Sequence, residues 1–266
     1  MYDFHIHSDF SMDGKFLMDE MAKAAIDKNI KSLCFTDHVD YEVGENKVDI
    51  DFRTNDYFRR VKQVKYKYMK EIEILAGVEI GMQPKLARRY NELIENNPFD
   101  FVIMSVHSID GLDIHYDRFT ENKEPIDAIS QYYEYLYQCI LDFNNYDVVG
   151  HLDYIDRYFE DFSHIPEFKR YANIVEKILK LIISRGKGIE INTGSIKYGL
   201  NYYHPKIEIL QMYKDLGGEI ITIGSDSHSP ENIGYDYKIV EKLLKEVGFK
   251  YIYIFKERKK YPIHIS

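Results

Sequence analysis

The sequence predicts an α/β fold in which strands and helices alternate and the strands close into a barrel. Short runs rich in β-forming residues alternate with longer segments of helical periodicity along the whole 266-residue chain. Repeated βα units of this length imply parallel strands, and seven or eight such units favour a closed barrel. No linker rich in Pro, Gly or Ser divides the chain. We therefore expect residues 1–266 to form a single domain, with a doubly wound open sheet as the alternative fold.

The individual elements follow from the apolar spacing. Strand segments are short and apolar, whereas helical segments place apolar residues on one face, as at Ile174, Ile178 and Leu181. The predicted strands are Tyr2–Ile6, Ser32–Thr36, Glu73–Glu79, Phe101–Ser105, Asp147–Gly150, Gly188–Ile191, Ile220–Ile223 and Lys250–Phe255. The predicted helices lie near Met18–Lys28, Asn55–Glu71, Pro84–Asn96, Ile126–Asn144, Glu167–Arg185, Pro205–Leu216 and Tyr235–Val247. No Gly-rich phosphate loop follows the first strand, which argues against a nucleotide-binding open sheet.

Two long connections follow the second and fourth predicted strands, at Val39–Thr54 and Ser108–Glu124. Loops longer than about 12–15 residues are often lids or binding segments. We therefore expect both loops to contribute to a site.

The composition narrows the class of protein. Hydrophobic residues make up 45% of the chain and charged residues 30%, which argues against disorder. The net charge of −9 argues against a protein that coats nucleic acid, because binding to a phosphate backbone requires clustered Lys and Arg. A small anionic substrate remains possible where metal ions reverse the local field. Cys34 and Cys139 lie in apolar segments, so we expect buried thiols and no disulfide.

The chain contains no cationic-then-apolar leader and no run of 18 apolar residues. We therefore expect a soluble cytoplasmic protein that binds no membrane. Whether it is a monomer or a homodimer stays open.

The first strand ends in a pair of histidines, His5 and His7. Side chains two residues apart in a strand point to the same side, so the two imidazoles can chelate one metal ion. A pair of this kind is more often two unrelated histidines when it stands alone. Its meaning therefore depends on the residues at the other strand ends.

Seven successive predicted strands finish in polar residues at their carboxyl ends, where barrels place their chemistry. These residues are His5, His7, Asp37, His38, Glu79, His107, His151, Asp153, Asn192, Asp226 and His228, which include six of the ten histidines. Each alone has an ordinary interpretation, such as a helix N-cap for Asp37 or Asp226, a core histidine for His151, or a buried ion pair for Glu79. Together they would leave many buried polar groups uncompensated, whereas a shared metal cluster would satisfy them all.

The residue types indicate which metals fit. Imidazole and carboxylate ligands without thiolate suit Zn²⁺, Mn²⁺ or Fe²⁺, and the sequence does not choose among these. The ligands are too many for one tetrahedral ion. Two or more ions about 3.5–4 Å apart, bridged by a carboxylate and a hydroxide, are typical of hydrolytic enzymes with such ligands.

The same residues resemble, in order, the motifs of the polymerase-and-histidinol-phosphatase (PHP) superfamily. The matching segments are His5-Ile-His7, Thr36-Asp37-His38, Gly77-Val78-Glu79, Val106-His107, Gly150-His151 and Ser225-Asp226-Ser227-His228. The resemblance extends from residue 2 to about residue 235. The chain length and the segments DFSMDG, GHLDYIDRY and EINTGSIKYG are most similar to the stand-alone histidinol-phosphate phosphatases of histidine biosynthesis.

The resemblance implies a distorted (β/α)7, TIM-like barrel that holds three divalent metal ions. In this arrangement His5 and His7 hold one ion together with Glu79 and Asp226, and Glu79 bridges to a second ion held by His107 and His151. The third ion is held by His38, His228 and a residue of the first loop. Many PHP proteins carry His at that loop position, and here the candidate is Asp13, with Asp9 as a substitute. Asp37 is assigned a supporting role behind the ligands.

The resemblance also implies an activity, the hydrolysis of L-histidinol phosphate to L-histidinol and phosphate. We expect in-line attack on phosphorus by a hydroxide that bridges metal ions, with no phosphoenzyme. Asp226 or His228 would assist proton transfer to the leaving alkoxide. Arg157 and Lys197 are the predicted phosphate-binding cations, although a solvated loop charge is an equal alternative for each.

Other residues are weaker candidates. His204 lies on the next loop and is more simply a surface histidine. Tyr41, Glu42, Asp110, Asp113 and His115 on the two long loops are unranked candidates for contacting the amino-imidazole end of the substrate.

Three rival functions stay open. A PHP phosphoesterase acting on another ester, such as a nucleotide or a sugar phosphate, would share the metal motifs. Metal-dependent amidohydrolases also begin with His-x-His, but commonly use a modified lysine where this chain has Glu79. A metal-stabilised module without activity is disfavoured because the ligand set is full.

Overall fold

The computed structural model describes residues 1–116 and 118–265, and it contains a nearly closed barrel of seven parallel strands. The strands follow one another in the sheet as β1 (Tyr2–Ile6), β2 (Ser32–Phe35), β5 (Glu73–Gly81), β6 (Phe101–Ser105), β9 (Val148–Val149), β10 (Gly188–Asn192) and β11 (Ile221–Gly224). Sheet order equals chain order, as repeated βα units require. The predicted α/β barrel is therefore confirmed, and the open doubly wound alternative is wrong.

The two ends of the sheet meet at β1 and β11. At the mouth of the barrel the backbone N–H of His7 donates to the carbonyl of Ser227 at 2.9 Å, within an isolated parallel bridge. Deeper in the barrel the buried carboxylate of Asp3 accepts the backbone N–H groups of Ser225 at 2.9 Å and Gly234 at 2.8 Å. The side chain of Asp3 therefore helps to join the first strand to the last.

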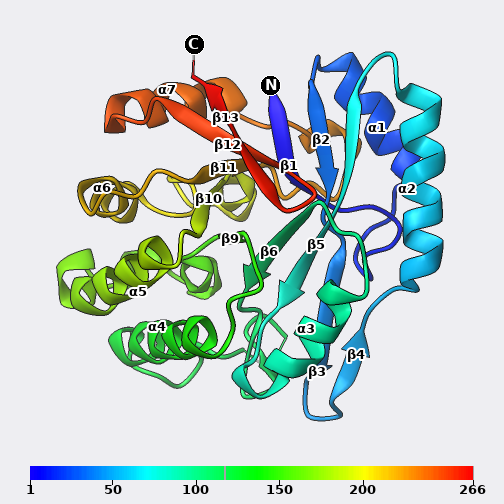
Figure 1. Ribbon diagram of the computed structural model, residues 1–266. Helices are drawn as coiled ribbons and strands as arrows, with labels where there is room; N and C mark the ends of the chain where they lie inside the picture. The colour runs from blue at the N-terminus through cyan, green and yellow to red at the C-terminus, as the bar shows by residue number, and fades with distance from the viewer. Residues whose placement is uncertain (117, 266) are drawn as a thin grey trace.

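Seven α-helices surround the described part of the barrel (Figure 1). They are α1 (Met18–Asp27), α2 (Thr54–Tyr68), α3 (Ala87–Glu95), α4 (Pro125–Asp142), α5 (Ala172–Ser184), α6 (Ile207–Asp215) and α7 (Tyr237–Val247). Helices α4 to α7 lie on one side of the strands and α1 to α3 on the other. Each buries an apolar face, for example Val175, Ile178 and Ile182 of α5. None of the described helices is long and apolar enough to cross a membrane.

The eighth predicted strand does not join the barrel. It forms β12 (Tyr251–Lys256), which pairs antiparallel with β13 (Lys259–His264) in a separate two-stranded sheet. Figure 1 shows this hairpin in red, across the barrel strands. Ile254 and Phe255 pack with Phe4 and Phe101 in a small apolar cluster. Because Phe101 opens β6, the hairpin closes the amino-terminal end of the barrel.

Both predicted long loops contain strands. The first holds β3 (His38–Val43) and β4 (Val48–Ile50), and β3 adds to the sheet in parallel with β5, with His38 opposite Glu79. The second holds the short hairpin of β7 (Ser108–Ile109) and β8 (Leu112–Asp113). The sequence analysis assigned both segments to a loop because β4 is only three residues long and mostly exposed, and because β3 places charged residues between its apolar ones.

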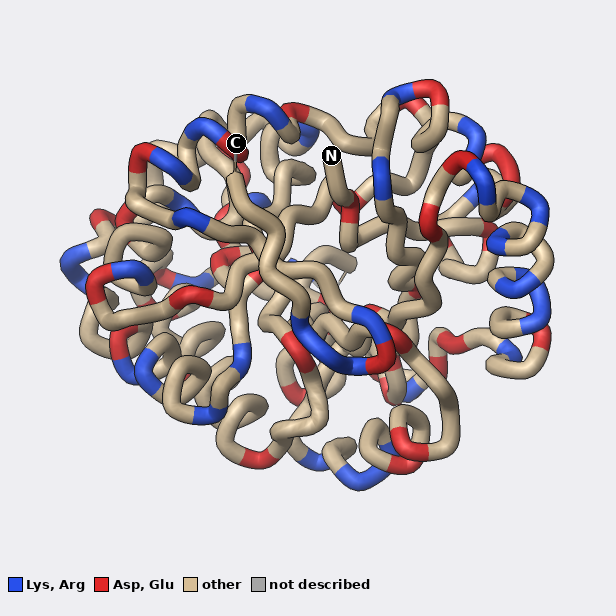
Figure 2. Tube along the Cα trace, turned by 45° about the horizontal axis from the view of Figure 1, so that its top comes forward, with Lys and Arg blue, Asp and Glu red and all other residues tan. Residues whose placement is uncertain are grey.

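Charged residues of both signs are interspersed over the outer helices, as Figure 2 shows. The two cysteines, Cys34 and Cys139, are buried and free, in agreement with the sequence analysis.

Candidate metal centre

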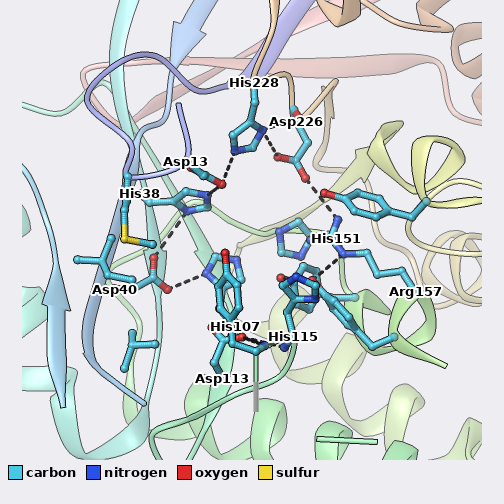
Figure 3. Close-up of a pocket in the computed structure, with 17 residues that line it drawn as sticks. Asp13, His38, Asp40, His107, Asp113, His115, His151, Arg157, Asp226 and His228 are labelled. Atoms are coloured by element: carbon cyan, nitrogen blue, oxygen red, sulfur yellow. Dashed lines mark hydrogen bonds and ion pairs between the residues drawn. The ribbon is translucent and has the colours of Figure 1, made fainter. Parts of the chain in front are cut away.

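The barrel brings the predicted polar residues together at its carboxyl-terminal end, and Figure 3 shows those that line the cavity, among them His38, His107, His151, Asp226 and His228. His5 lies in β1 and His7 just after it, His38 opens β3, and Glu79 lies in β5. His107, His151, Asp226 and His228 follow β6, β9 and β11, and Asp13 lies in the loop between β1 and α1. These side chains come from almost the whole length of the chain. The predicted convergence at one end of the barrel is therefore observed.

Glu79 is fully buried and has imidazoles on both sides of its carboxylate. Its Oε2 atom lies 3.1 Å from His5 Nε2, 3.5 Å from His7 Nε2 and 3.0 Å from His38 Nδ1. Its Oε1 atom lies 2.9 Å from His151 Nε2 and 3.3 Å from His107 Nε2. A carboxylate with one oxygen facing each set of nitrogens can bridge two cations.

Asp226 completes the first set. Its Oδ1 atom lies 3.3 Å from His7 Nε2 and 3.7 Å from His5 Nε2. The backbone of Asp226 has a φ of 52°, in the left-handed region that disfavours residues with a side chain. Strain of this kind is concentrated at functional sites. His5, His7, Glu79 and Asp226 thus offer four ligand atoms around one point.

Asp13 lies at the outer side of the cluster. Its Oδ2 atom lies 2.9 Å from His228 Nε2 and 3.8 Å from His38 Nε2. The ring of His38 has its Nδ1 atom toward Glu79, so this side chain lies between the inner cluster and Asp13. Asp9, the substitute considered for Asp13, is exposed and is not among the described residues that line the cavity.

Buried oxygens behind the cluster fix the orientation of the imidazoles. His5 Nδ1 lies 2.6 Å from Glu190 Oε1, and His107 Nδ1 lies 2.7 Å from Asp40 Oδ1. Each contact leaves the Nε2 atom of the ring facing Glu79, as in the carboxylate–histidine–metal arrangement of many metal sites. Glu190 approaches through space that Gly224 leaves open, since a Cβ there would lie 2.1 Å from Glu190 Oε1.

Asp37 supports the first loop. Its Oδ1 atom accepts the backbone N–H of Ser8 at 2.6 Å and the hydroxyl of Ser11 at 2.9 Å. The Ser11 hydroxyl in turn lies 3.0 Å from His7 Nδ1. This geometry is compatible with the supporting role that the sequence analysis gave to Asp37.

Sequence reasoning missed Asp40. It contacts His107 at 2.7 Å and lies 3.6 Å from His38 Nδ1 through Oδ2, which makes it a neighbour of two candidate ligands. The alternation of polar and apolar residues along His38–Val43 was the available signal for a strand, but most of the segment was assigned to a loop.

The described residues fit a metal cluster better than a self-contained polar network. Atoms His5 Nε2, His7 Nε2, His38 Nδ1 and Glu79 Oε2 are buried, and no described residue makes a hydrogen bond to them. Buried polar atoms without partners cost about 1–3 kcal/mol each, so several at one point indicate a ligand. Each of the three nitrogens lies 3.0–3.5 Å from Glu79 Oε2.

The electrostatics of the cluster also favour bound cations. Burial opposes a charged imidazole at His38, but the carboxylates of Glu79 and Asp40 outweigh it and raise the pKa of His38 to about 9. Burial likewise opposes ionisation of Glu79, yet His5 and His38 hold the pKa of Glu79 well below its ordinary value. The centre therefore stabilises positive charge beside an ionised bridging carboxylate.

A cavity of about 210 Å³ opens beside the cluster, and it is lined both by candidate metal ligands and by residues outside the cluster. His38, His107, His151, Asp226 and His228 form its inner wall, and Met12, Val43, Ile50, Asp113, His115, Tyr116, Tyr154, Arg157, Tyr158 and Tyr198 contribute to the rest. Asp113 and His115, two of the unranked loop candidates, therefore reach the cavity. Tyr41, Glu42 and Asp110 are not among the described residues that line it.

Arg157 brings a cation to the cavity, next to Asp226 of the inner wall. Its side chain is only 7% exposed, and its Nη1 atom lies 3.9 Å from Asp226 Oδ2. The guanidinium packs over the rings of Tyr154 at 3.9 Å and Tyr198 at 4.3 Å. No described residue makes a hydrogen bond to Nη1. This atom is therefore available to an anion in the cavity.

Two other sequence candidates lie elsewhere. The ammonium of Lys197 donates to the carbonyl of Ser225 at 3.2 Å, and Lys197 is not among the described cavity-lining residues. His204 is fully buried, with Nδ1 at 2.5 Å from Asp153 Oδ1. The interpretation of His204 as a surface histidine was wrong, because its partner lies 51 residues away in the sequence.

Comparison with known proteins agrees with this arrangement. The family model of the PHP domain matches residues 3–194, which is more than half of the chain. The chain belongs to the PHP family. Asp226 and His228 lie beyond the matched segment, and the geometry alone joins them to the other PHP residues.

Several curated PHP relatives match over nearly their full length. The histidinol-phosphatase of Lactococcus lactis is 32% identical over 93% of this chain and 91% of the relative. The probable histidinol-phosphatases of Thermotoga maritima and Clostridium acetobutylicum are 31% and 30% identical, and 94% and 99% of their lengths are covered.

Solved structures give the same result. The crystal structure of histidinol phosphate phosphatase from Lactococcus lactis, complexed with zinc, L-histidinol and phosphate, has a TM-score of 0.89 and 30% identity, with 98% of each chain covered. A second structure, of the histidinol phosphatase assigned by similarity in Listeria monocytogenes, has a TM-score of 0.69 at 19% identity and shows the fold alone.

Proposed function

We propose that this PHP protein hydrolyses L-histidinol phosphate to L-histidinol and inorganic phosphate with the help of three divalent metal ions, Zn²⁺, Mn²⁺ or Fe²⁺. The observation that carries the proposal is the position of Arg157, a buried cation beside a cluster of metal-ligand type, whose Nη1 atom lies 3.9 Å from Asp226 and makes no hydrogen bond to any described residue. A phosphate monoester needs both features, because its oxygens carry negative charge that opposes an anionic nucleophile. The full-length similarity to histidinol-phosphatases supports this substrate.

We assign the ligands by the sets that the side chains form. His5, His7, Glu79 and Asp226 would hold one ion, and Glu79, His107 and His151 a second. Asp13, His38 and His228 would hold the third, with His38 also facing the bridging Glu79. Bound divalent ions supply an activated water at neutral pH and neutralise the oxygens of the phosphate.

The remaining steps belong to the side chains around the cavity. Arg157 would bind a non-bridging phosphate oxygen through Nη1, and its stacking on Tyr154 and Tyr198 limits the directions in which it can point. Asp226 and His228 line the same wall and are the two candidates to donate a proton to the leaving alkoxide. Lys197 is not among the described residues that line the cavity, and its ammonium donates to the carbonyl of Ser225, so its contribution to phosphate binding would be the smaller one.

The outer wall suits the organic part of L-histidinol phosphate, an amine and an imidazole. Asp113 supplies a carboxylate, and Tyr116 and Tyr158 supply aromatic faces. An ammonium group gains from a carboxylate and an imidazole from an aromatic ring. A nucleotide or a simple sugar phosphate has no protonated aliphatic amine to pair with this carboxylate.

Steady-state kinetics on a panel of esters tests the proposal. We expect kcat/KM for L-histidinol phosphate to exceed that for nucleoside monophosphates and sugar phosphates, with metal content measured on the same protein. Arg157→Ala should raise KM for the ester about tenfold or more, since it removes a charge-assisted hydrogen bond. Equal kcat/KM across the panel would favour another PHP phosphoesterase, and an unchanged KM would remove Arg157 from the phosphate site.

A further inference from the structure

The short turn that carries Arg157 rests on a buried charged network on its far side from the cavity. The turn is a 3-10 helix, η2 (Tyr154–Tyr158), which follows β9 and His151. Arg157 faces the cavity, whereas Asp153 and Asp156 are fully buried and bind a different part of the chain. The partners of both aspartates lie in residues 202–206, just before α6.

Asp153 anchors the start of the turn. Its Oδ1 atom lies 2.5 Å from His204 Nδ1, and its Oδ2 atom accepts the backbone N–H of Lys206 at 2.8 Å. His204 is itself tied to the barrel, because its backbone exchanges two hydrogen bonds with Asn192 at the end of β10, at 2.6 and 3.0 Å. The segment that receives the aspartates is therefore fixed to the barrel wall.

Asp156 anchors the turn next to Arg157. Its Oδ2 atom lies 2.6 Å from Lys206 Nζ and accepts the hydroxyl of Tyr202 at 2.8 Å. Lys206 Nζ also donates to the hydroxyl of Tyr171 at 2.8 Å. Burial opposes the charge of Lys206, but the carboxylates of Asp156 and Asp153 outweigh it and raise the pKa of the lysine above its ordinary value.

Burial of the Lys206–Asp156 ion pair costs desolvation free energy. The two side chains are 8% and 0% exposed, and the attraction within a buried pair is often offset by the loss of hydration. Apolar residues could fill such a site at equal stability. A buried pair next to a functional residue is better explained by the geometry it imposes.

Arg157 depends on its turn for that geometry. Among the described residues, its only hydrogen bond runs from Nε to the hydroxyl of Tyr158, at 3.1 Å, and Tyr158 belongs to the same turn. The rings of Tyr154 and Tyr158, over which it packs, belong to the turn as well. Outside the turn the guanidinium contacts Tyr198 at 4.3 Å and Asp226 at 3.9 Å, but most of its contacts come from η2. The position of η2 therefore contributes most to the direction of the guanidinium, and η2 is held through Asp153 and Asp156.

We propose that Lys206 is a positioning residue for phosphate binding, acting through Asp156 on the turn that carries Arg157. This inference rests on the proposed role of Arg157. Lys206 touches neither the cavity nor any of the candidate metal ligands among the described residues. Its loss should therefore weaken phosphate binding and leave metal content unchanged.

A double-mutant cycle with inorganic phosphate as the probe tests this. The inhibition constant of phosphate and KM for L-histidinol phosphate are measured for wild type, Lys206→Met, Arg157→Ala and the double variant, with metal content determined for each. We expect Lys206→Met to weaken phosphate inhibition about threefold to tenfold, the range of coupled neighbours, with kcat changed less than KM. In the Arg157→Ala background the same substitution should have no further effect.

Two further variants separate positioning from general destabilisation. Arg258→Met removes the cation from another buried aspartate, Asp147, at the opposite end of the barrel, and should lower the melting temperature without weakening phosphate inhibition. Asp156→Asn keeps the shape of the carboxylate while breaking the ion pair, and should reproduce the effect of Lys206→Met even if the latter folds poorly.

The outcomes distinguish the two proposals. Arg157→Ala with normal phosphate inhibition would overturn the assigned role of Arg157, and the positioning role with it. The positioning role alone would be overturned by a different result: Arg157→Ala weakens phosphate inhibition as expected, but Lys206→Met and Asp156→Asn leave it unchanged. Equal losses in the wild-type and Arg157→Ala backgrounds would do the same, since they would show that Lys206 acts independently of Arg157.

Discussion

Both ends of the barrel bury charged residues, but the two ends differ in whether these residues find partners within the protein. At the amino-terminal end Asp147 accepts the backbone N–H of Val102 at 2.8 Å and binds Arg258 Nε at 2.6 Å. At the carboxyl-terminal end His5, His7 and Glu79 keep buried atoms that no described residue satisfies. The charged pair at the first end is satisfied within the protein, although the hydroxyls of Ser32 and Tyr146 near it have no partner among the described residues. At the second end several imidazole and carboxylate atoms without partners face one another, which indicates a bound ligand.

Removal of metal should have the largest effect of all, and it should act on the carboxyl-terminal end of the barrel, where the candidate ligands lie. We expect dialysis against a chelator to abolish phosphatase activity, because it takes the positive charge from a centre of carboxylates and imidazoles. The melting temperature should also fall, since ions that bind only the folded state stabilise it. Activity after return of Zn²⁺, Mn²⁺ or Fe²⁺, measured with metal content, checks this. Full activity in metal-free protein would contradict the metal assignment.

Glu79→Ala should be the most damaging single substitution at the carboxyl-terminal end. Both oxygens of Glu79 face candidate ligand sets, so its loss removes a ligand from two ions at once. We expect kcat to fall more than about a hundredfold, beyond the range for residues that only support a ligand. Elemental analysis should show fewer metal ions per chain. Retention of more than about a tenth of the activity would argue against a bridging role.

Asp40→Asn and Glu190→Gln should have intermediate effects. Each carboxylate orients one imidazole, His107 or His5, at 2.7 and 2.6 Å. Loss of the negative charge makes the imidazole a weaker ligand, and we expect a loss of metal affinity of about tenfold to a hundredfold. Titration of metal-free protein with Zn²⁺ measures it. Asp147→Asn at the other end is the matched control and should leave the affinity unchanged.

The sequence predicted that the candidate ligand residues lie together because their order along the chain follows the strands; their role as metal ligands stays a prediction. In a parallel barrel every strand ends at the same face, so polar residues at strand ends must converge. All nine predicted ligand positions accordingly lie around one cavity or directly behind it. Individual strand bounds were less certain, and β5 continues to Gly81, beyond the predicted end at Glu79.

The residues that sequence reasoning missed are those whose partners are distant. Asp40 contacts His107 across 67 residues, and His204 contacts Asp153 across 51. Nothing in the local pattern of either residue indicates such a partner. The position of β12 was mispredicted for a related reason. An apolar strand has the same sequence pattern whether it joins a barrel or covers its end in a hairpin, as β12 does with β13.

Arg258→Met should have the smallest effect on catalysis and tests the other side of the comparison. It leaves Asp147 with its backbone donor but without its cation, and we expect the free energy of unfolding to fall by about 1–3 kcal/mol. The candidate metal cluster lies at the opposite end, so kcat, KM and metal content should stay at wild-type values. Denaturant unfolding and steady-state kinetics on the same preparation check both parts. A loss of metal or activity that matches the loss of stability would mean that the two ends are coupled through the strands, and that the amino-terminal end also shapes the site.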